Sequence, residues 1–390
     1  MGYTASGAEA ARVPVHAGAR GLQQRIREEA RHIGFALCGF VRIEPLAHTD
    51  FVRQWLAAGH AAGMGYIARG LAKRLNPRLL VPGARSIITL GYRYLPPPVP
   101  PVNWQEQLRG RIAAYALGTD YHLTVAGKLR QLAASITRLH ADAVVRLYVD
   151  TGPVLEREWA AGGGAGWFGK NTNVLHVHEG SYFFLGELLT NLELDPDPLV
   201  PDHCGTCTRC LDLCPTAALK PGYVLDARLC ISYLTIEHRG SIPVELRARL
   251  GNWIFGCDIC QVVCPWNEKL VRRHGAPEAG ALLPFLPELL ALDAAEFHRR
   301  FRRSAIHRAK RDGLVRNVAA ALGNTGNPAA VAPLRRALHE DPAHVVRGHA
   351  AWALGNIGGH AARRALELAR RSEPAGEVRD EIDGALAALA

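Results

Sequence analysis

The chain has 390 residues, enough for two or three domains, and its hydrophobic fraction of 48% is ordinary for a globular protein with a sizeable core. No apolar run approaches the length of a membrane span and no signal peptide is evident, so we expect a cytoplasmic protein with residues 1–20 as a flexible tail. These features exclude a membrane-spanning protein and a small secreted disulfide scaffold. The formal net charge of +10 favours anionic partners such as nucleic acid.

Residues 21–195 combine helical and strand patterns without a regular alternation, which predicts a domain of the α+β class. The periodicity of apolar residues predicts helices over residues 23–36 and 121–139 and strands over residues 85–92 and 143–150. Thr151-Gly152-Pro153 ends the last of these strands and precedes another helix. Residues 173–178 and 182–189 are expected to pair as a β-hairpin.

Eight of the nine cysteines lie between residues 204 and 264, inside a segment (196–280) that we expect to be a separate domain. The first run has the spacing of a bacterial ferredoxin: Cys204-x2-Cys207-x2-Cys210-x3-Cys214-Pro215. In that pattern three thiolates hold one [4Fe–4S] cluster and the fourth ligates a second cluster. The spacing therefore predicts a ferredoxin-like domain with two clusters.

The second run, Cys257-x2-Cys260-x3-Cys264-Pro265, lacks its first cysteine, and Ile254 stands in that place. Cys230 is the only cysteine left in the segment, so we expect it to fill the gap. The predicted ligand sets are Cys204, Cys207, Cys210 and Cys264 for one cluster, and Cys214, Cys230, Cys257 and Cys260 for the other. Structural zinc in four-cysteine sites is the competing interpretation, although zinc sites usually use paired C-x2-C knuckles.

Residues 281–390 are predicted to be helical and contain an internal repeat of 32 residues. Ala321-Leu322-Gly323-Asn324 recurs as Ala353-Leu354-Gly355-Asn356, and Asp341-Pro342-Ala343 recurs as Glu373-Pro374-Ala375. Short two-helix units with an Ala-Leu stripe are typical of HEAT-like repeats, with an ordinary helical bundle as the alternative. Nothing in the repeats suggests a self-complementary seam, so we expect a monomer.

Two polar segments of the first domain are candidates for chemistry. Asp150 ends a predicted strand, where its side chain could act as a general acid with a pKa raised by a poorly solvated pocket, or could merely cap a turn. Gly169-Lys170-Asn171-Thr172-Asn173 is a polar turn that could hydrogen-bond the amides of a ligand. Neither segment shows a dinucleotide fingerprint or a P-loop.

Several long motifs in order resemble the epoxyqueuosine reductase family. They are Arg111 to His122 (RIAAYALGTDYH), Asp150 to Arg157 (DTGPVLER), Gly166 to Thr172 (GWFGKNT), the cysteine runs, and Tyr233 to Glu237 (YLTIE). The resemblance covers roughly residues 20–390. The chain departs from the family pattern at Gly162, Ala165 and Ser232, where the family usually carries arginine, leucine and asparagine.

The resemblance implies an oxidoreductase that reduces epoxyqueuosine to queuosine at the wobble position of tRNAs with a GUN anticodon (those for aspartate, asparagine, histidine and tyrosine). It implies a nitroreductase-like, cobalamin-binding first domain, two [4Fe–4S] clusters, and an external electron donor such as flavodoxin or ferredoxin. Asp150 then becomes the proton donor. The implied cobalamin-binding residues are Lys73, Ala113, Asp150, Lys170, Asn171, Thr172, Asn173 and Ser232.

A strongly basic run opens the helical domain, with eight basic residues and one acid, Asp312, between positions 299 and 316. Such a run is usually a solvated helix face, but the imbalance of charge favours phosphate binding. The predicted RNA-binding residues are Arg299, Arg300, Arg302, Arg303, Arg308, Lys310, Arg311 and Arg316. Two rival functions are another cobalamin-dependent enzyme, such as a reductive dehalogenase, and an electron carrier without a substrate of its own.

Overall fold

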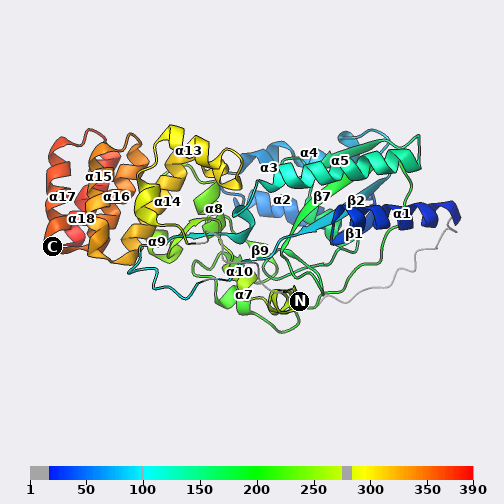
Figure 1. Ribbon diagram of the computed structural model, residues 1–390, viewed down its shortest axis with the longest axis horizontal. Coiled ribbons are helices and arrows are strands. Elements are labelled where there is room, and N and C mark those ends of the chain that lie inside the picture. Colours follow the sequence, from blue (N-terminus) through cyan, green and yellow to red (C-terminus); the bar gives the residue numbers. More distant parts are fainter. Residues whose placement is uncertain (1–16, 99, 275–282, 390) are drawn as a thin grey trace.

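The computed structural model describes residues 17–98, 100–274 and 283–389. The molecule is elongated, with a domain of helices and strands at one end, stacked helices at the other, and the cysteine segment between and below them (Figure 1). This arrangement confirms the expected α+β class with a helical C-terminal part. Across the described ranges, no helix is both long and apolar enough to cross a bilayer.

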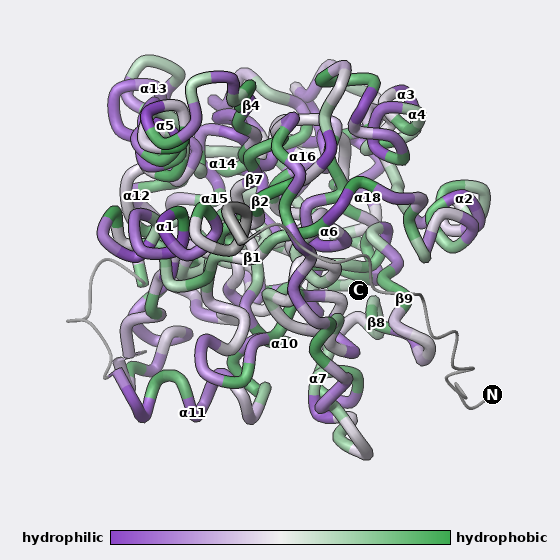
Figure 2. Tube along the Cα trace, turned by 90° about the vertical axis from the view of Figure 1, so that its right-hand side faces the viewer, coloured by the Kyte–Doolittle hydropathy of each residue, from purple (hydrophilic) through white to green (hydrophobic). Residues whose placement is uncertain are grey.

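An antiparallel sheet of four strands, in the order β1-β2-β7-β4, forms the centre of the first domain. The strands are β1 (Leu37–Arg42), β2 (Ser86–Arg93), β4 (Val145–Tyr148) and β7 (Phe183–Thr190). The central strands β2 and β7 are buried on both faces over most of their length, which explains why both are nearly continuous apolar runs (Figure 2).

Helices cover both faces of this sheet. On one face α1 (Ala17–Ile33) and α5 (Tyr121–Leu139) pack on alternate strand residues such as Ile88 and Leu188. On the other face α6 (Glu156–Gly162) packs Trp159 against Ile87 and Leu189. The expected helix 121–139 is confirmed at both ends, whereas α1 begins inside the expected tail, of which residues 1–16 lie outside the described ranges.

Shorter elements connect these layers. They are α2 (Thr49–Ala57), α3 (Gly65–Arg69), α4 (Leu71–Leu75), η1 (Pro77–Leu79), β3 (Arg111–Ile112), η2 (Ala114–Ala116), β5 (Trp167–Phe168) and β6 (Val174–Leu175).

The expected β-hairpin between residues 173–178 and 182–189 is wrong. β6 pairs instead with β5, and β7 joins the central sheet, so that only an isolated bridge joins His176 and Gly180. The turn is held from outside, because Asn267 accepts a hydrogen bond from the Ser181 N–H at 2.6 Å. A contact from the cysteine segment thus replaces the local ladder that the sequence pattern suggested.

The cysteine segment contains only short elements. They are α7 (Arg209–Asp212), β8 (Leu219–Lys220), β9 (Val224–Leu225), α8 (Ile231–Ile236), α9 (Val244–Arg247), η3 (Ala248–Leu250), β10 (Trp253–Phe255), α10 (Ile259–Val262) and α11 (Pro265–His274). Strand β10 pairs in parallel with β3, which joins the segment to the first domain.

The C-terminal part is wholly helical where it is described. Its elements are α12 (Leu286–Leu290), α13 (Ala294–Phe301), η4 (Ala305–Ala309), α14 (Lys310–Thr325), η5 (Pro328–Ala330), α15 (Val331–Glu340), α16 (His344–Ile357), α17 (Gly359–Ser372) and α18 (Gly376–Ala388). Helices α14, α16 and α18 stack closely because of the repeated glycines: a methyl group at Gly323 would lie 2.8 Å from the Ala353 Cβ, and one at Gly355 would lie 2.7 Å from the Ala385 Cβ.

The repeated asparagine joins each stacked helix to the layer before it. Asn356 on α16 donates to the Gly323 carbonyl of α14 at 3.0 Å. Asn324, one repeat earlier, donates to the Arg247 and Gly251 carbonyls of the cysteine segment at 2.9 and 2.7 Å. The same residue of the repeat therefore ties helix to helix in one copy and helix to cysteine segment in the other.

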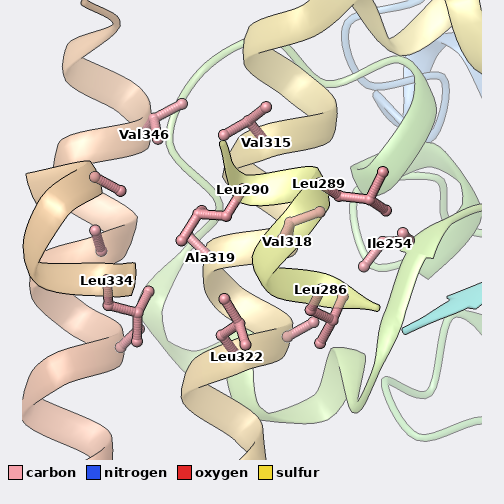
Figure 3. Packing of buried hydrophobic residues seen from close by; sticks show 14 of the residues in the cluster. Ile254, Leu286, Leu289, Leu290, Val315, Val318, Ala319, Leu322, Leu334 and Val346 are labelled. Atoms are coloured by element: carbon pink, nitrogen blue, oxygen red, sulfur yellow. The ribbon is translucent and has the colours of Figure 1, made fainter. Parts of the chain in front are cut away.

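Ile254, which stands where a tandem ferredoxin would carry a cysteine, is fully buried in the largest core cluster. It lies near Leu286 and Leu289 of α12, beside α14 (Figure 3). The position therefore serves the interface between the cysteine segment and the helical domain.

Arg316 anchors the same interface from α14. Its fully buried guanidinium donates to the carbonyls of Leu234, His238 and Gly240 at 2.7, 3.0 and 2.6 Å. The neighbouring Asn317 donates to the carbonyls of Thr235 and Ile254. These bonds satisfy carbonyls in the last turn of α8, in the loop that follows it and in β10.

We predict that Arg316→Ala lowers the free energy of unfolding by about 3 kcal/mol or more, because it leaves several buried carbonyls without a donor and creates a cavity. Arg335→Ala, an exposed change on α15, is the matched control and should stay within about 0.5 kcal/mol of the wild type. Denaturant titration followed by circular dichroism measures both variants, and equal midpoints for the two would contradict the anchoring role.

Candidate functional site

Asp150 lies directly after β4 with a backbone φ of +52°, in the left-handed region that residues other than glycine rarely adopt. This conformation costs on the order of 1–2 kcal/mol, so the surrounding structure must hold it. The Glu156 carboxylate, in the first turn of α6, accepts a hydrogen bond from the Asp150 N–H. The turn thereby presents the Asp150 side chain at the end of the strand.

Two side chains from the start of α5 bind the Asp150 carboxylate. The Tyr121 hydroxyl donates to Oδ2 at 2.8 Å, and the Nε2 atom of His122 lies 3.2 Å from the same oxygen. Tyr121 is held in place by stacking on Phe184, with ring centroids 4.4 Å apart. Sequence reasoning assigned no role to Tyr121 or His122, although both lie in a motif that carried the family resemblance.

The expectation that Asp150 is buried and mostly protonated is wrong for this geometry. Its side chain is 56% exposed. Partial burial raises its pKa, but the hydrogen bonds from His122 and Tyr121 outweigh that effect, and the pKa is lowered overall. As described, Asp150 is therefore a carboxylate at neutral pH.

The proton belongs instead to His122, which lies between two carboxylates. Its Nδ1 atom is 2.7 Å from Asp120, and its Nε2 atom faces Asp150. Burial lowers the pKa of His122, but the hydrogen bonds to Asp150 and Asp120 outweigh burial and raise it above the usual value. The two carboxylates therefore favour the protonated imidazole, and His122 and Asp150 form a hydrogen-bonded acid pair.

Four cysteines line a cavity of about 210 Å³ at the edge of the first domain. The lining cysteines are Cys204, Cys207, Cys210 and Cys264, and three cations, Lys170, Arg209 and Lys269, complete the wall. Burial and, after it, the charges of Cys204, Cys264 and Cys207 raise the pKa of Cys210 to about 11. These thiols are therefore close neighbours.

The other four cysteines form a second group. Burial raises the pKa of Cys257, with added effects from Cys230 and Cys214, and the pKa of Cys260 is raised by burial and then by Cys257 and Cys230. Cys210 also acts on Cys260, so the two groups adjoin.

The arrangement suits iron–sulfur clusters better than single zinc ions. Within the parts of the chain that the structure describes, no three Cys, His, Asp or Glu side chains are grouped as one metal ion requires. A four-iron cluster bonds each thiolate to a different iron atom, so its ligands surround a volume rather than a point. The cavity between the first four cysteines provides such a volume.

Two of the residues expected to bind cobalamin contact the cysteine segment. The Lys170 ammonium donates to the carbonyls of Gly205 and Cys207 at 2.7 and 3.0 Å, and the Asn171 amide donates to the Cys260 carbonyl at 3.2 Å. Both side chains therefore help to hold the loops of the cysteine segment against the first domain.

The remaining expected cobalamin residues lie around the second cysteine group or on the surface. Ala113 is buried in the apolar cluster that also contacts Cys230 and Cys257. Thr172, Asn173 and Ser232 are half-buried, and Lys73 on α4 is exposed. Thr172 accepts a hydrogen bond from Arg157 at 3.0 Å through its carbonyl.

The basic run divides into exposed and engaged residues. Arg300, Arg302, Arg303 and Lys310 are exposed; Arg299 and Arg308 are exposed as well but pair with Glu296 and Glu237. Arg316 is fully buried, so its predicted contact with RNA is wrong. The predicted RNA contact of Arg311 is wrong as well, because its largely buried guanidinium pairs with Asp341.

A buried acid, Glu187, and a half-buried acid, Glu156, near Asp150 were missed in the sequence. Glu187 lies in the middle of the buried strand β7, and Glu156 follows the Thr-Gly-Pro turn. The signal for Glu187 was present, because a glutamate inside a continuous apolar run is unexpected unless it has a partner or a task.

Three family models match this chain. Residues 74–151 match the family described as epoxyqueuosine reductase QueG, residues 203–267 match a 4Fe-4S double cluster binding domain, and residues 300–387 match HEAT repeats. The predictions of a two-cluster segment and of HEAT-like repeats are thereby confirmed.

Solved structures give the same result over nearly the whole chain. A crystal structure of epoxyqueuosine reductase with a tRNA-Tyr epoxyqueuosine-modified tRNA stem loop has a TM-score of 0.88 at 33% identity, covering 95% of this chain and 99% of that one. A Bacillus subtilis epoxyqueuosine reductase, with its aspartate-bearing catalytic loop swung out of the active site, has a TM-score of 0.88 at 32% identity, covering 95% of this chain and 100% of that one.

Curated relatives agree with the structures. The epoxyqueuosine reductase of Xanthomonas campestris is 42% identical over 333 residues, which are 83% of this chain and 93% of that protein. The enzyme of the same name from Pseudomonas aeruginosa is 41% identical over 334 residues, 84% of this chain and 92% of that protein. The chain therefore belongs to the epoxyqueuosine reductase family.

Proposed function

We propose that this chain reduces epoxyqueuosine to queuosine at the wobble position of tRNA anticodons, with Asp150 as the proton donor. As a member of its family the chain is an oxidoreductase. The observation that carries the proposal is the convergence of three features at one place: the acid formed by Asp150 and His122, the second cysteine group, and the exposed basic segment.

Arg157 connects the acid with the second cysteine group. Its positive charge lowers the pKa of both Asp150 and Cys230, so the guanidinium lies near both side chains. A substrate that accepts a proton from Asp150 would therefore lie close to the point at which electrons leave this cysteine group.

The basic segment borders the acid on its other side. The Asp120 N–H donates to the Arg303 carbonyl at 2.8 Å, only two residues before His122. Tyr66 lies beside Arg308, and the charges of both Arg308 and Asp150 affect its pKa. Phosphates bound by Arg300, Arg302, Arg303 and Lys310 would place an anticodon loop next to Asp150.

The two cysteine groups supply electrons one at a time. We assign Cys204, Cys207, Cys210 and Cys264 to one [4Fe–4S] cluster and Cys214, Cys230, Cys257 and Cys260 to the other. An external donor of the flavodoxin or ferredoxin type would reduce the first cluster, whose cavity wall includes Lys170, Arg209 and Lys269. These cations stabilise the added negative charge of the reduced cluster.

Residues around Asp150 and the second cysteine group would hold cobalamin, by the chemistry of their side chains. Ala113 and its apolar neighbours would face the ring, and Thr172, Asn173 and Ser232 offer amide and hydroxyl groups for its side-chain amides. When bound, it would supply a low-valent cobalt able to pass electrons to the substrate carbon.

The proton-transfer step follows from the contacts of Asp150. Removing the epoxide oxygen as water requires two electrons and two protons. His122 passes its proton to Asp150, and Asp150 protonates the departing oxygen. His122 then takes up a new proton through Asp120 or from solvent. Tyr121 orients the carboxylate throughout.

We expect Cys230→Ser to reduce iron and labile sulfide by about half, because it removes one thiolate from only one of the two sets. Cys38→Ser is the control, since Cys38 lies on β1 outside the cysteine segment, and its iron content should equal that of the wild type. Iron and sulfide analysis after anaerobic reconstitution measures both. An unchanged content in Cys230→Ser would exclude it as a ligand.

For Asp150→Ala we expect turnover to fall by about 100-fold or more, the usual size of a general acid's contribution, while cobalamin binding largely survives. Asp142→Ala, in the exposed loop before β4, should behave as the wild type. Nucleoside analysis of tRNA treated with protein, cobalamin and reductant gives the rates. Persistence of epoxyqueuosine with the wild-type protein would refute the proposed function itself.

The double variant Arg302→Ala/Arg303→Ala should bind a tRNA stem loop more weakly. The slope of its binding affinity against salt concentration should also fall, by the equivalent of up to about two phosphate contacts. The control Arg25→Ala/Arg31→Ala removes the same charge from α1, which packs on the far half of α5. Binding titrations at several salt concentrations compare the two. An identical salt slope in all three proteins would show that the basic segment does not contact the RNA.

A further inference from the structure

Glu187 is a buried carboxyl group on β7 that the proposed reaction does not use. Its side chain is fully buried, and neither carboxyl oxygen has a hydrogen-bond partner of normal geometry among the described residues. A solitary buried carboxylate is strongly unfavourable, so such a group is either neutral or paired.

The carboxyl of Glu156 lies close enough to Glu187 to be its side-chain hydrogen-bond partner when one of the two carboxyls carries a proton. Burial raises the pKa of Glu187 well above its usual value, and the charges of Glu156 and Asp150 add to that effect. Burial and, after it, the charge of Asp150 raise the pKa of Glu156 to about 7, although Arg157 opposes the shift. Two adjacent carboxyls in this position cannot both be ionised at neutral pH.

Little else near the pair can balance a second negative charge. Glu187 lies opposite Thr89 of β2 and Tyr148 of β4 in the sheet, and neither residue is cationic. Arg157, on α6, and Arg74, on α4, interact with Glu156 and with Asp150, whereas the charges that act on Glu187 are those of Glu156 and Asp150 themselves. One proton therefore remains between the two glutamates.

The shared proton affects Asp150 through the other contact of Glu156. Glu156 accepts the Asp150 N–H, the bond that holds Asp150 in its left-handed conformation. A neutral Glu187 can donate its proton to Glu156 and so orient the carboxylate toward that N–H. An ionised Glu187 would repel Glu156 instead.

We propose that Glu187 is a positioning residue for the reaction: in its neutral form it donates a hydrogen bond to Glu156, and Glu156 in turn fixes the peptide of Asp150. The inference rests on the proposed function only for its kinetic consequence. The hydrogen bonds that Glu156 accepts from Glu187 and from the Asp150 peptide are properties of the protein without cofactor or tRNA. Loss of the shared proton would release the Asp150 turn.

Glu187→Gln and Glu187→Leu test the proposal together. Glutamine keeps a donor for Glu156 and should hold kcat within about threefold of the wild type, whereas leucine removes the donor and should lower kcat by about tenfold, the equivalent of one hydrogen bond. KM for the tRNA stem loop should not change in either. Glu193→Gln, an exposed acid close by in the chain, is the control. If the Glu187→Leu protein does not fold, Glu187→Met takes its place as the variant without a hydrogen-bond donor.

Two measurements on the protein without cofactor or tRNA separate this inference from the proposed function. Infrared spectra with carbon-13-labelled glutamate should show a protonated carboxyl band at neutral pH in the wild type and not in Glu187→Gln. The Asp150 amide should exchange with solvent faster in Glu187→Leu than in Glu187→Gln.

The stability curve provides a third readout. Because the folded state binds the shared proton more tightly than the unfolded chain, the unfolding free energy of the wild type should fall between about pH 5 and 8, and Glu187→Gln should flatten that fall. A Gln variant as slow as the Leu variant, a Leu variant as fast as the wild type, or no protonated carboxyl in the wild type would each overturn the proposal.

Discussion

The peptide groups of the cysteine segment impose the constraint on which the rest of the structure depends. Loops that wrap clusters leave many carbonyls outside regular ladders, and buried carbonyls must find donors. The donors come from both neighbouring domains: Lys170 and Asn171 reach from the first domain, and Arg316 and Asn317 reach from the helical domain. The two cysteine groups, the acid at Asp150 and the basic segment are thus held in one frame.

The acid at Asp150 illustrates how local conformation and charge depend on each other. The left-handed turn brings the carboxylate to Tyr121 and His122, and those contacts stabilise its ionised form. An ionised aspartate beside a histidine with a raised pKa can receive a proton from that histidine.

Much of this organisation could be predicted from sequence, for reasons that differ between regions. Helix 121–139 was predictable because Asp120 caps it and its apolar period is regular, and the repeats because Gly323 and Gly355 recur in register. The failures all involve partners distant in the chain. Arg316 looked like its exposed neighbours until its burial against the carbonyls of residues 234–240 was seen, and the expected hairpin was lost to a contact from Asn267. Charge runs and alternation carry no information about which distant backbone will need a donor.

The two repeated asparagines have a consequence for the helical domain as a unit. A repeat array needs a cap at each end to cover its first and last faces. Asn356 binds the preceding helix of the array, whereas Asn324 makes the equivalent bond to the turn at Arg247 and Gly251. The cysteine segment therefore takes the place of a missing first repeat and caps the solenoid. Loss of its clusters would expose the end of the array, so the integrity of the helical domain is linked to the supply of iron and sulfide.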